Sequence, residues 1–128
     1  MKTMKLEIVT PHGLIYEGDV AQVTLPGKEG EFGVLPEHAS LVSLLDAGVI
    51  TVDTGNKKEM NVAINGGYVK VDESKVSCIV DGAVALSDED GELSKRIEEA
   101  KELLKKAETS STAIATAVGK VESVVKLR

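Results

Sequence analysis

One stretch in the first third of the chain, residues 25–39, restricts the possible folds more than any other. It holds glycine at every third position, Gly27, Gly30 and Gly33, together with two of the three prolines in the sequence. Proline fixes φ and lacks a backbone N–H, while glycine loses the most conformational freedom on folding. We therefore expect no helix here. We expect a rigid, shaped loop that follows a strand ending at Leu25.

The tip of this stretch carries large apolar side chains between the glycines. Phe32, Val34 and Leu35 stand there beside the charged residues Glu29 and Glu31. Two interpretations are open: the tip closes one end of a β-sandwich, or it displays these side chains to a partner. Because apolar residues tend to be buried, the residue types favour the first interpretation. The glycine spacing matches neither G-x-G-x-x-G nor G-x-x-x-x-G-K-[ST], which argues against a phosphate-binding loop.

Apolar and polar residues alternate through most of residues 5–86, in short runs divided by glycine, proline and aspartate. Alternation with a period of two is typical of strands that bury one face. We therefore expect residues 1–86 to form an antiparallel β-sandwich of about eight to ten short strands. Turns or bulges are expected between these strands, at residues 10–13, 17–19, 46–48, 53–56, 65–67, 72–74 and 81–82.

The pattern changes after a polar run at residues 87–91, which we interpret as a linker between two domains. Beyond this run there is no proline, and apolar residues recur every three or four positions. Such spacing predicts helices at residues 92–108 and 113–126, separated by a Ser/Thr-rich break that offers an N-cap. Residues 92–128 are therefore expected to form an antiparallel two-helix hairpin.

The second of these helices is predicted to be weak. It contains Gly119 and β-branched residues such as Val121 and Val124, each of which costs up to ~1 kcal/mol of helix propensity relative to alanine. The apolar seam between the two helices is also small. Two interpretations follow and both stay open. The hairpin can open or detach, or packing holds it in a static arrangement.

Composition and charge exclude several classes of function. The formal net charge is −6 and aromatic residues make up 2% of the chain, so we expect no nucleic-acid binding. No apolar run is long enough to span a membrane, so we expect no direct membrane insertion. His12, His38 and the single cysteine, Cys78, form no metal-binding or nucleophile pattern. We therefore expect a protein that is not an enzyme, with no catalytic and no metal-binding residues.

Residues 27–39, read together, are similar to the signature G-x-x-G-x-x-G-V-L-P-x-H-A of the epsilon subunit of F-type ATP synthases. The segments at residues 6–13 and 65–69 resemble that family too, as does the order of a sandwich followed by two short helices. The resemblance extends over essentially the whole chain. It implies a non-catalytic rotor subunit that couples the gamma subunit to the membrane c-ring during proton-driven ATP synthesis.

The resemblance also implies a location and a set of contacts. The protein would be a peripheral part of a bacterial ATP synthase, at the cytoplasmic face of the inner or plasma membrane. The resemblance favours display of the loop over inward packing. The residues that it places at the contact with the c-ring or with gamma are Gly30, Glu31, Phe32, Gly33, Val34, Leu35, Pro36 and His38.

In this family the C-terminal hairpin lies against the sandwich or extends along gamma, where it inhibits ATP hydrolysis. The resemblance implies that its basic residues then approach the catalytic beta subunit. The candidates for these inhibitory contacts are Lys95, Arg96, Lys101, Lys105, Lys106, Lys120, Lys126 and Arg128.

No cofactor is expected. Some bacterial members bind ATP through the pattern Ile/Leu-Asp-x-x-Arg-Ala, but this chain has Ser94 at the Asp position and Ile97 at the Arg position. Arg96 lies one residue out of register, about 100° around the helix. We therefore expect weak or absent ATP binding. The alternative function, a free-standing β-sandwich that binds a small ligand or carbohydrate, is disfavoured because such modules usually offer exposed aromatic rings.

Overall fold

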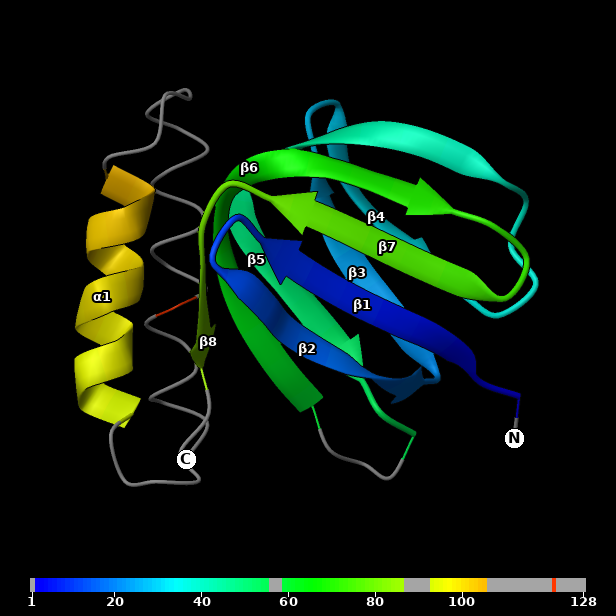
Figure 1. Cartoon of the computed structure of the whole chain (residues 1–128), viewed down its shortest axis with the longest axis horizontal. Helices are drawn as coiled ribbons and strands as arrows, with labels where there is room; N and C mark the ends of the chain where they lie inside the picture. Colours follow the sequence, from blue (N-terminus) through cyan, green and yellow to red (C-terminus); the bar gives the residue numbers. More distant parts are fainter. Residues whose placement is uncertain (1, 56–58, 87–92, 106–120, 122–128) are drawn as a thin grey trace.

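The computed structural model describes residues 2–55, 59–86, 93–105 and 121, and it contains a β-sandwich with one helix against its side (Figure 1). Eight strands and one helix are defined in these residues. The strands are β1 (Met4–Thr10), β2 (Gly13–Val20), β3 (Gln22–Gly27), β4 (Gly30–Val34), β5 (Leu41–Asp53), β6 (Glu59–Val71), β7 (Lys75–Val80) and β8 (Ala83–Leu86), and the helix is α1 (Leu93–Lys105).

The strands follow the order β2-β1-β7-β6-β5-β3-β4, and β8 pairs with β6 beside this path. The prediction of a β-sandwich of about eight to ten strands is confirmed, with eight strands in the described residues. The prediction of purely antiparallel pairing is wrong for one pair, because β1 and β7 run parallel from Lys5↔Lys75 to Val9↔Ile79. That pairing joins segments about 70 residues apart, which local alternation in the sequence cannot reveal.

Two long strands, β5 and β6, belong to both layers of the sandwich. The first part of β6 pairs with β8 up to Ile64, and the second part pairs with β7 from Gly67 onward. Between these parts Gly66 and Gly67 have φ values of 120° and 145°, which glycine adopts readily. Figure 1 shows β6 curving through this region, from its pairing with β8 to its pairing with β7. The turn or bulge expected at residues 65–67 is therefore a bend inside one continuous strand.

The turns expected at residues 17–19 and 46–48 are wrong, because both segments lie inside strands. Gly18 continues β2, where a Cβ would lie 2.7 Å from the Tyr16 hydroxyl. Gly48 continues β5, where a Cβ would lie 2.6 Å from Cβ of Pro26. Each glycine is therefore needed to leave space for a neighbouring side chain, and neither glycine reverses the chain.

The main core lies between the two layers and is built from aliphatic side chains of every strand except β8. Alternate residues of β1 show the pattern, since Met4, Leu6 and Ile8 point inward with at most 4% of their surface exposed. Cys78 is part of this core, and its burial raises the pKa of the thiol to about 12. Cys78 is thus buried in the way a small apolar side chain would be.

A second, smaller core joins α1 to the outer side of β5, β6 and β8. Ile97, Ala100 and Leu104 recur every three or four residues on α1 and point into it. From the strands come Ala47, Val49, Ala63 and Leu86. Three of these seven side chains are alanines, so the contact buries little apolar surface per residue.

The expected first helix, residues 92–108, is confirmed over the range of α1. The expected second helix, residues 113–126, lies outside the described residues except for Val121. This residue has a helical conformation and is fully buried in the second core. In the described part of the chain no helix is long and apolar enough to cross a membrane.

Candidate interaction surface

The glycine-rich stretch forms a β-hairpin, where the sequence predicts a rigid, shaped loop. β3 and β4 pair from Val23↔Val34 to Gly27↔Gly30, and Lys28 and Glu29 make the turn between them. Gly30 has a φ of 131°, a backbone conformation that residues other than glycine rarely adopt. The glycine spacing therefore serves a tight hairpin, which residue types alone did not distinguish from a loop.

Side chains of β4 alternate between the core and the solvent. Val34 is fully buried and Phe32 packs against the main core, while Glu31 and Gly33 are exposed. A Cβ on Gly27 would lie 2.8 Å from Cε1 of Phe32, so the ring lies directly over this glycine. The inward-packing interpretation therefore holds for Phe32 and Val34, and Val34 offers no side-chain surface to a partner in this conformation.

The segment after β4 displays its apolar residue outward. Leu35 exposes 56% of its surface, and two residues later Glu37 turns the chain with a φ of 68°. The amide of Glu37 donates to the carbonyl oxygen of Glu73 (3.1 Å), and the Glu37 carboxylate accepts from Nζ of Lys2 (2.8 Å). His38 is half-buried, and its backbone amide donates a hydrogen bond to the carbonyl oxygen of Leu35. The predicted contact residues thus lie on one hairpin and on the anchored turn that follows it.

The sequence analysis missed a row of apolar side chains on the outer face of the sheet. One residue from each of five neighbouring strands contributes, because the registers align them side by side. The apolar row consists of Leu44 (β5), Tyr68 (β6), Ile79 (β7), Val9 (β1) and Leu14 (β2). Leu44, Tyr68 and Leu14 are exposed, and Val9 and Ile79 are half-buried. At the usual strand spacing the row is about 19 Å long.

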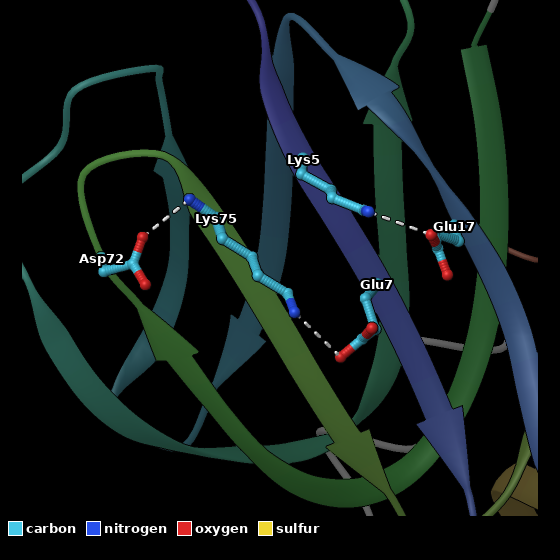
Figure 2. Close-up of polar contacts among 5 residues, drawn as sticks. All are labelled: Lys5, Glu7, Glu17, Asp72 and Lys75. Carbon is cyan, nitrogen blue, oxygen red and sulfur yellow. Dashed lines mark hydrogen bonds and ion pairs between the residues drawn. The ribbon is translucent and has the colours of Figure 1, made fainter.

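Charged residues of β1, β2 and β7, some of which Figure 2 shows, border the apolar row on the same face. Directly opposed residues of β1 and its neighbours carry like charges, Lys5 with Lys75 and Glu7 with Glu17. Diagonal ion pairs compensate for this, at 3.0 Å between Lys5 and Glu17 and 3.6 Å between Lys75 and Glu7. The hydrogen bond to Glu17 raises the pKa of Lys5. An apolar strip with a charged margin is typical of a protein interface.

The turn between β6 and β7 closes this charged margin. Asp72 accepts hydrogen bonds from the backbone N–H groups of Ser74 (3.0 Å) and Lys75 (2.8 Å), the second of which Figure 2 shows. These bonds favour the ionised carboxylate and hold the pKa of Asp72 below its ordinary value. The turn is therefore fixed next to Glu73, whose carbonyl oxygen anchors the segment after β4.

A groove of about 550 Å³ lies between the hairpin turn and the first residues of β5. The amide of Lys28 donates to the carbonyl oxygen of Leu44 (3.1 Å), which ties the two walls together. The groove is lined by Gly27, Lys28, Glu29, Gly30, Glu31, Phe32, Val42, Ser43 and Leu44. Since Leu44 belongs to both, the groove continues the apolar row toward the hairpin.

The candidate inhibitory residues are described only in part. Lys95 and Lys105 are exposed on α1, Arg96 is half-buried, and Lys101 lies 4.0 Å from Glu98. Lys106, Lys120, Lys126 and Arg128 fall outside the described residues. Ser94 is exposed, whereas Ile97 is 6% exposed and packs in the second core. Within the described ranges no three His, Cys, Asp or Glu side chains are arranged to hold a metal ion.

Comparison with known proteins gives consistent similarities. Residues 3–86 match the family model described as "ATP synthase, Delta/Epsilon chain, beta-sandwich domain". The chain is 68% identical to the ATP synthase epsilon chain of Sulfurovum sp. (strain NBC37-1), over 98% of both chains. It is 49% identical to the ATP synthase epsilon chain of Campylobacter concisus (strain 13826), over 100% of both.

A solved structure shares the fold at lower identity. The chain aligns with a chain of the Euglena gracilis mitochondrial ATP synthase (OSCP/F1/c-ring) with a TM-score of 0.68 and 24% identity. The alignment covers 96% of this chain and 81% of that one.

Proposed function

Because this chain belongs to the family of ATP synthase epsilon chains, we propose that it couples the gamma subunit to the c-ring during proton-driven ATP synthesis. The epsilon chain is a non-catalytic subunit of ATP synthase, which is a membrane-associated complex. A free-standing ligand-binding module is not favoured, since the relatives match over their whole length. We further propose that the subunit lies at the cytoplasmic face of the bacterial membrane.

The apolar row is the observation that best supports a docking role. Exposed apolar side chains that form a continuous strip usually mark an interface, whereas isolated ones do not. Here Leu44, Tyr68 and Leu14 are exposed by 44–59%, and Val9 and Ile79 connect them. We assign this row and its charged margin to the gamma subunit.

The hairpin and the turn after it are assigned to the c-ring. Glu31, Leu35, Pro36 and His38 supply the contact surface, while Phe32 and Val34 hold its shape from inside. Hydrogen bonds at Lys28 and Glu37 fix the hairpin and the turn to the sandwich. A surface that is already ordered loses little conformational entropy on docking, which suits the transfer of torque.

The C-terminal region is assigned to the inhibition of ATP hydrolysis. Its described helix rests on a core that is rich in alanine, so its release costs less than the opening of the sandwich. Removal of residues 92–128 is expected to leave assembly intact and to abolish inhibition. Unchanged hydrolysis in the truncated complex would remove the inhibitory role and leave the coupling role in place.

A tagged copy of the full chain tests the assignment of partners. Recovery from detergent-solubilised membranes is expected to yield gamma and the c-ring together. The variant Leu35→Ser is expected to weaken recovery of the c-ring while gamma stays bound. Loss of gamma with retention of the c-ring would contradict the assignment of the two surfaces.

A further inference from the structure

Asn65 lies in the contact between α1 and the sandwich, next to apolar side chains. Side chains alternate along β6, so Asn61, Ala63 and Asn65 share the face that α1 covers, and Ala63 belongs to the second core. The register places Asn65 opposite Ala47 of β5, which belongs to that core as well. A polar amide therefore stands at a position whose neighbours on the sheet are alanines.

The turn between β7 and β8 brings α1 to this amide. The backbone N–H of Asn65 donates to the carbonyl oxygen of Gly82 (3.3 Å), so the turn lies against the bend of β6. A Cβ on Gly82 would lie 3.2 Å from Nδ2 of Asn65 and 3.2 Å from Cδ1 of Leu103. The side chains of Asn65 and Leu103 thus meet over Gly82, which places no side chain between them.

The amide oxygen of Asn65 is buried without a hydrogen bond. Its Oδ1 accepts none from the part of the chain that the structure describes. Asn61, on the same face, offers a direct comparison, because its Oδ1 accepts a hydrogen bond from Oγ1 of Thr51 (3.0 Å). A buried acceptor without a donor carries its full desolvation cost, whereas a paired acceptor does not.

We propose that the unpaired oxygen of Asn65 weakens the docking of α1 and so sets how readily this helix leaves the sandwich. While α1 is docked, it shields the oxygen from water on the side of Leu103. Once α1 leaves, water hydrates the oxygen and the desolvation cost disappears. One such group changes the docking equilibrium roughly 5- to 150-fold. The effect on docking follows from the contact alone, and its consequence for ATP hydrolysis rests on the proposed inhibitory role.

Hydrogen exchange of the full-length protein measures the docking of α1 directly. The backbone amides of Ala100 and Leu104 report the opening of α1, and the amides of β1 report the sandwich. Asn65→Leu removes the oxygen and nearly keeps the size of the side chain. We expect this variant to raise the protection of the two α1 amides at least fivefold and to leave the β1 amides unchanged.

Asn65→Asp makes the opposite change at nearly constant shape. An ionised carboxylate loses more hydration on burial than an amide does, so we expect the protection of α1 to fall at least fivefold at neutral pH. The loss relative to wild type should disappear below about pH 4, where the carboxyl group is neutral. Wild-type protection of α1 in Asn65→Asp at neutral pH would overturn the proposal.

Asn61→Leu is the matched control, since it makes the same replacement on the same face at an oxygen that already has a donor. We expect no rise in the protection of α1, because the change breaks the hydrogen bond with Thr51 and removes no unpaired group. Equal protection of α1 in Asn65→Leu and the wild type, or an equal rise in Asn61→Leu, would overturn the proposal.

ATP hydrolysis separates this inference from the inhibitory role. Membranes depleted of this chain are resupplied with the wild type or with Asn65→Leu, and the rate of hydrolysis is measured. We expect Asn65→Leu to inhibit less, because it holds α1 on the sandwich. Raised protection of α1 with unchanged inhibition would overturn the inhibitory role and support the inference about docking. Unchanged protection of α1 would overturn the inference, whatever the rate of hydrolysis.

Discussion

The variant Leu44→Ser tests whether the apolar row binds gamma, and the structure sets the size of the effect. Full burial of a leucine side chain stabilises by about 1.5–3 kcal/mol. Leu44 exposes 59% of its surface in the free chain, so a docked partner can recover roughly 1–2 kcal/mol at this position. We therefore expect the dissociation constant for gamma to rise roughly 5- to 30-fold.

The same substitution is expected to leave folding almost unchanged. Leu44 points away from the core, and exposed substitutions usually alter the free energy of unfolding by less than about 0.5 kcal/mol. Leu35→Ser is the matched control, since Leu35 is 56% exposed but lies outside the row. Titration calorimetry with gamma measures both variants. An unchanged affinity in Leu44→Ser, or an equal loss in Leu35→Ser, would refute the assignment of the row.

Four further outcomes follow from the structure. Gly67→Ala is expected to unfold or severely destabilise the sandwich in urea titrations. The new Cβ would clash with the Ile79 carbonyl oxygen, and residues other than glycine rarely adopt the φ of 145° found at this position. A free energy of unfolding equal to that of the wild type would contradict this. Asp72→Ala is expected to lower Tm at neutral pH. The stabilisation from ionised Asp72 is complete above its unfolded pKa of about 3.8 and is lost as the pH falls through the lower folded pKa, so the difference in Tm should shrink in acid. The Cys78 thiol is expected to react with a disulfide reagent only as fast as the protein unfolds, because the side chain is fully buried and this burial raises its pKa to about 12; rapid labelling would show that the core opens locally. Calorimetry is expected to detect weak or no ATP binding, since buried Ile97 stands at the arginine position of the ATP-binding pattern described above for some members; binding at millimolar ATP or tighter would contradict this.

The alternation of apolar residues was enough to predict the sandwich, and polar residues marked the breaks between strands at 10–13, 72–74 and 81–82, but glycine was misleading at two positions. Glycine indicated a chain reversal at residues 17–19 and 46–48, yet both glycines relieve contacts, with Tyr16 and Pro26 respectively. Local patterns cannot separate these two uses of glycine, because the contact that requires it comes from a residue placed by the fold. The same limit applies to Gly67, whose backbone lies against Ile79 of the neighbouring strand.

The candidate site was predictable only in part, for a related reason. The hairpin segment stood out because its residues are close together in the sequence. The apolar row did not, since Val9, Leu14, Leu44, Tyr68 and Ile79 become neighbours only through the strand registers. A single exposed leucine or tyrosine has little meaning by itself. Their alignment across five strands makes them a surface.

The sequence also did not predict which side chains of the hairpin face the core and which face the solvent. Residue types favoured an inward-facing tip, and the family resemblance favoured an outward-facing one. Because side chains alternate along β4, some residues of the tip face inward and others outward: Phe32 and Val34 face the core and Glu31 faces the solvent. Leu35 lies beyond the end of the strand and faces outward. Replacement of the whole segment would therefore disturb the core, whereas Glu31 and Leu35 can be changed singly.

Proton pumping per ATP hydrolysed is the measurement that tests the coupling role most directly. It is made in inverted membrane vesicles that are depleted of this chain and then resupplied with the full-length protein. The account predicts that depleted vesicles hydrolyse ATP without pumping protons, and that the wild-type protein restores pumping. It also predicts that the double variant Leu35→Ser/Leu44→Ser restores pumping poorly. Normal pumping per ATP in the depleted vesicles would contradict the account.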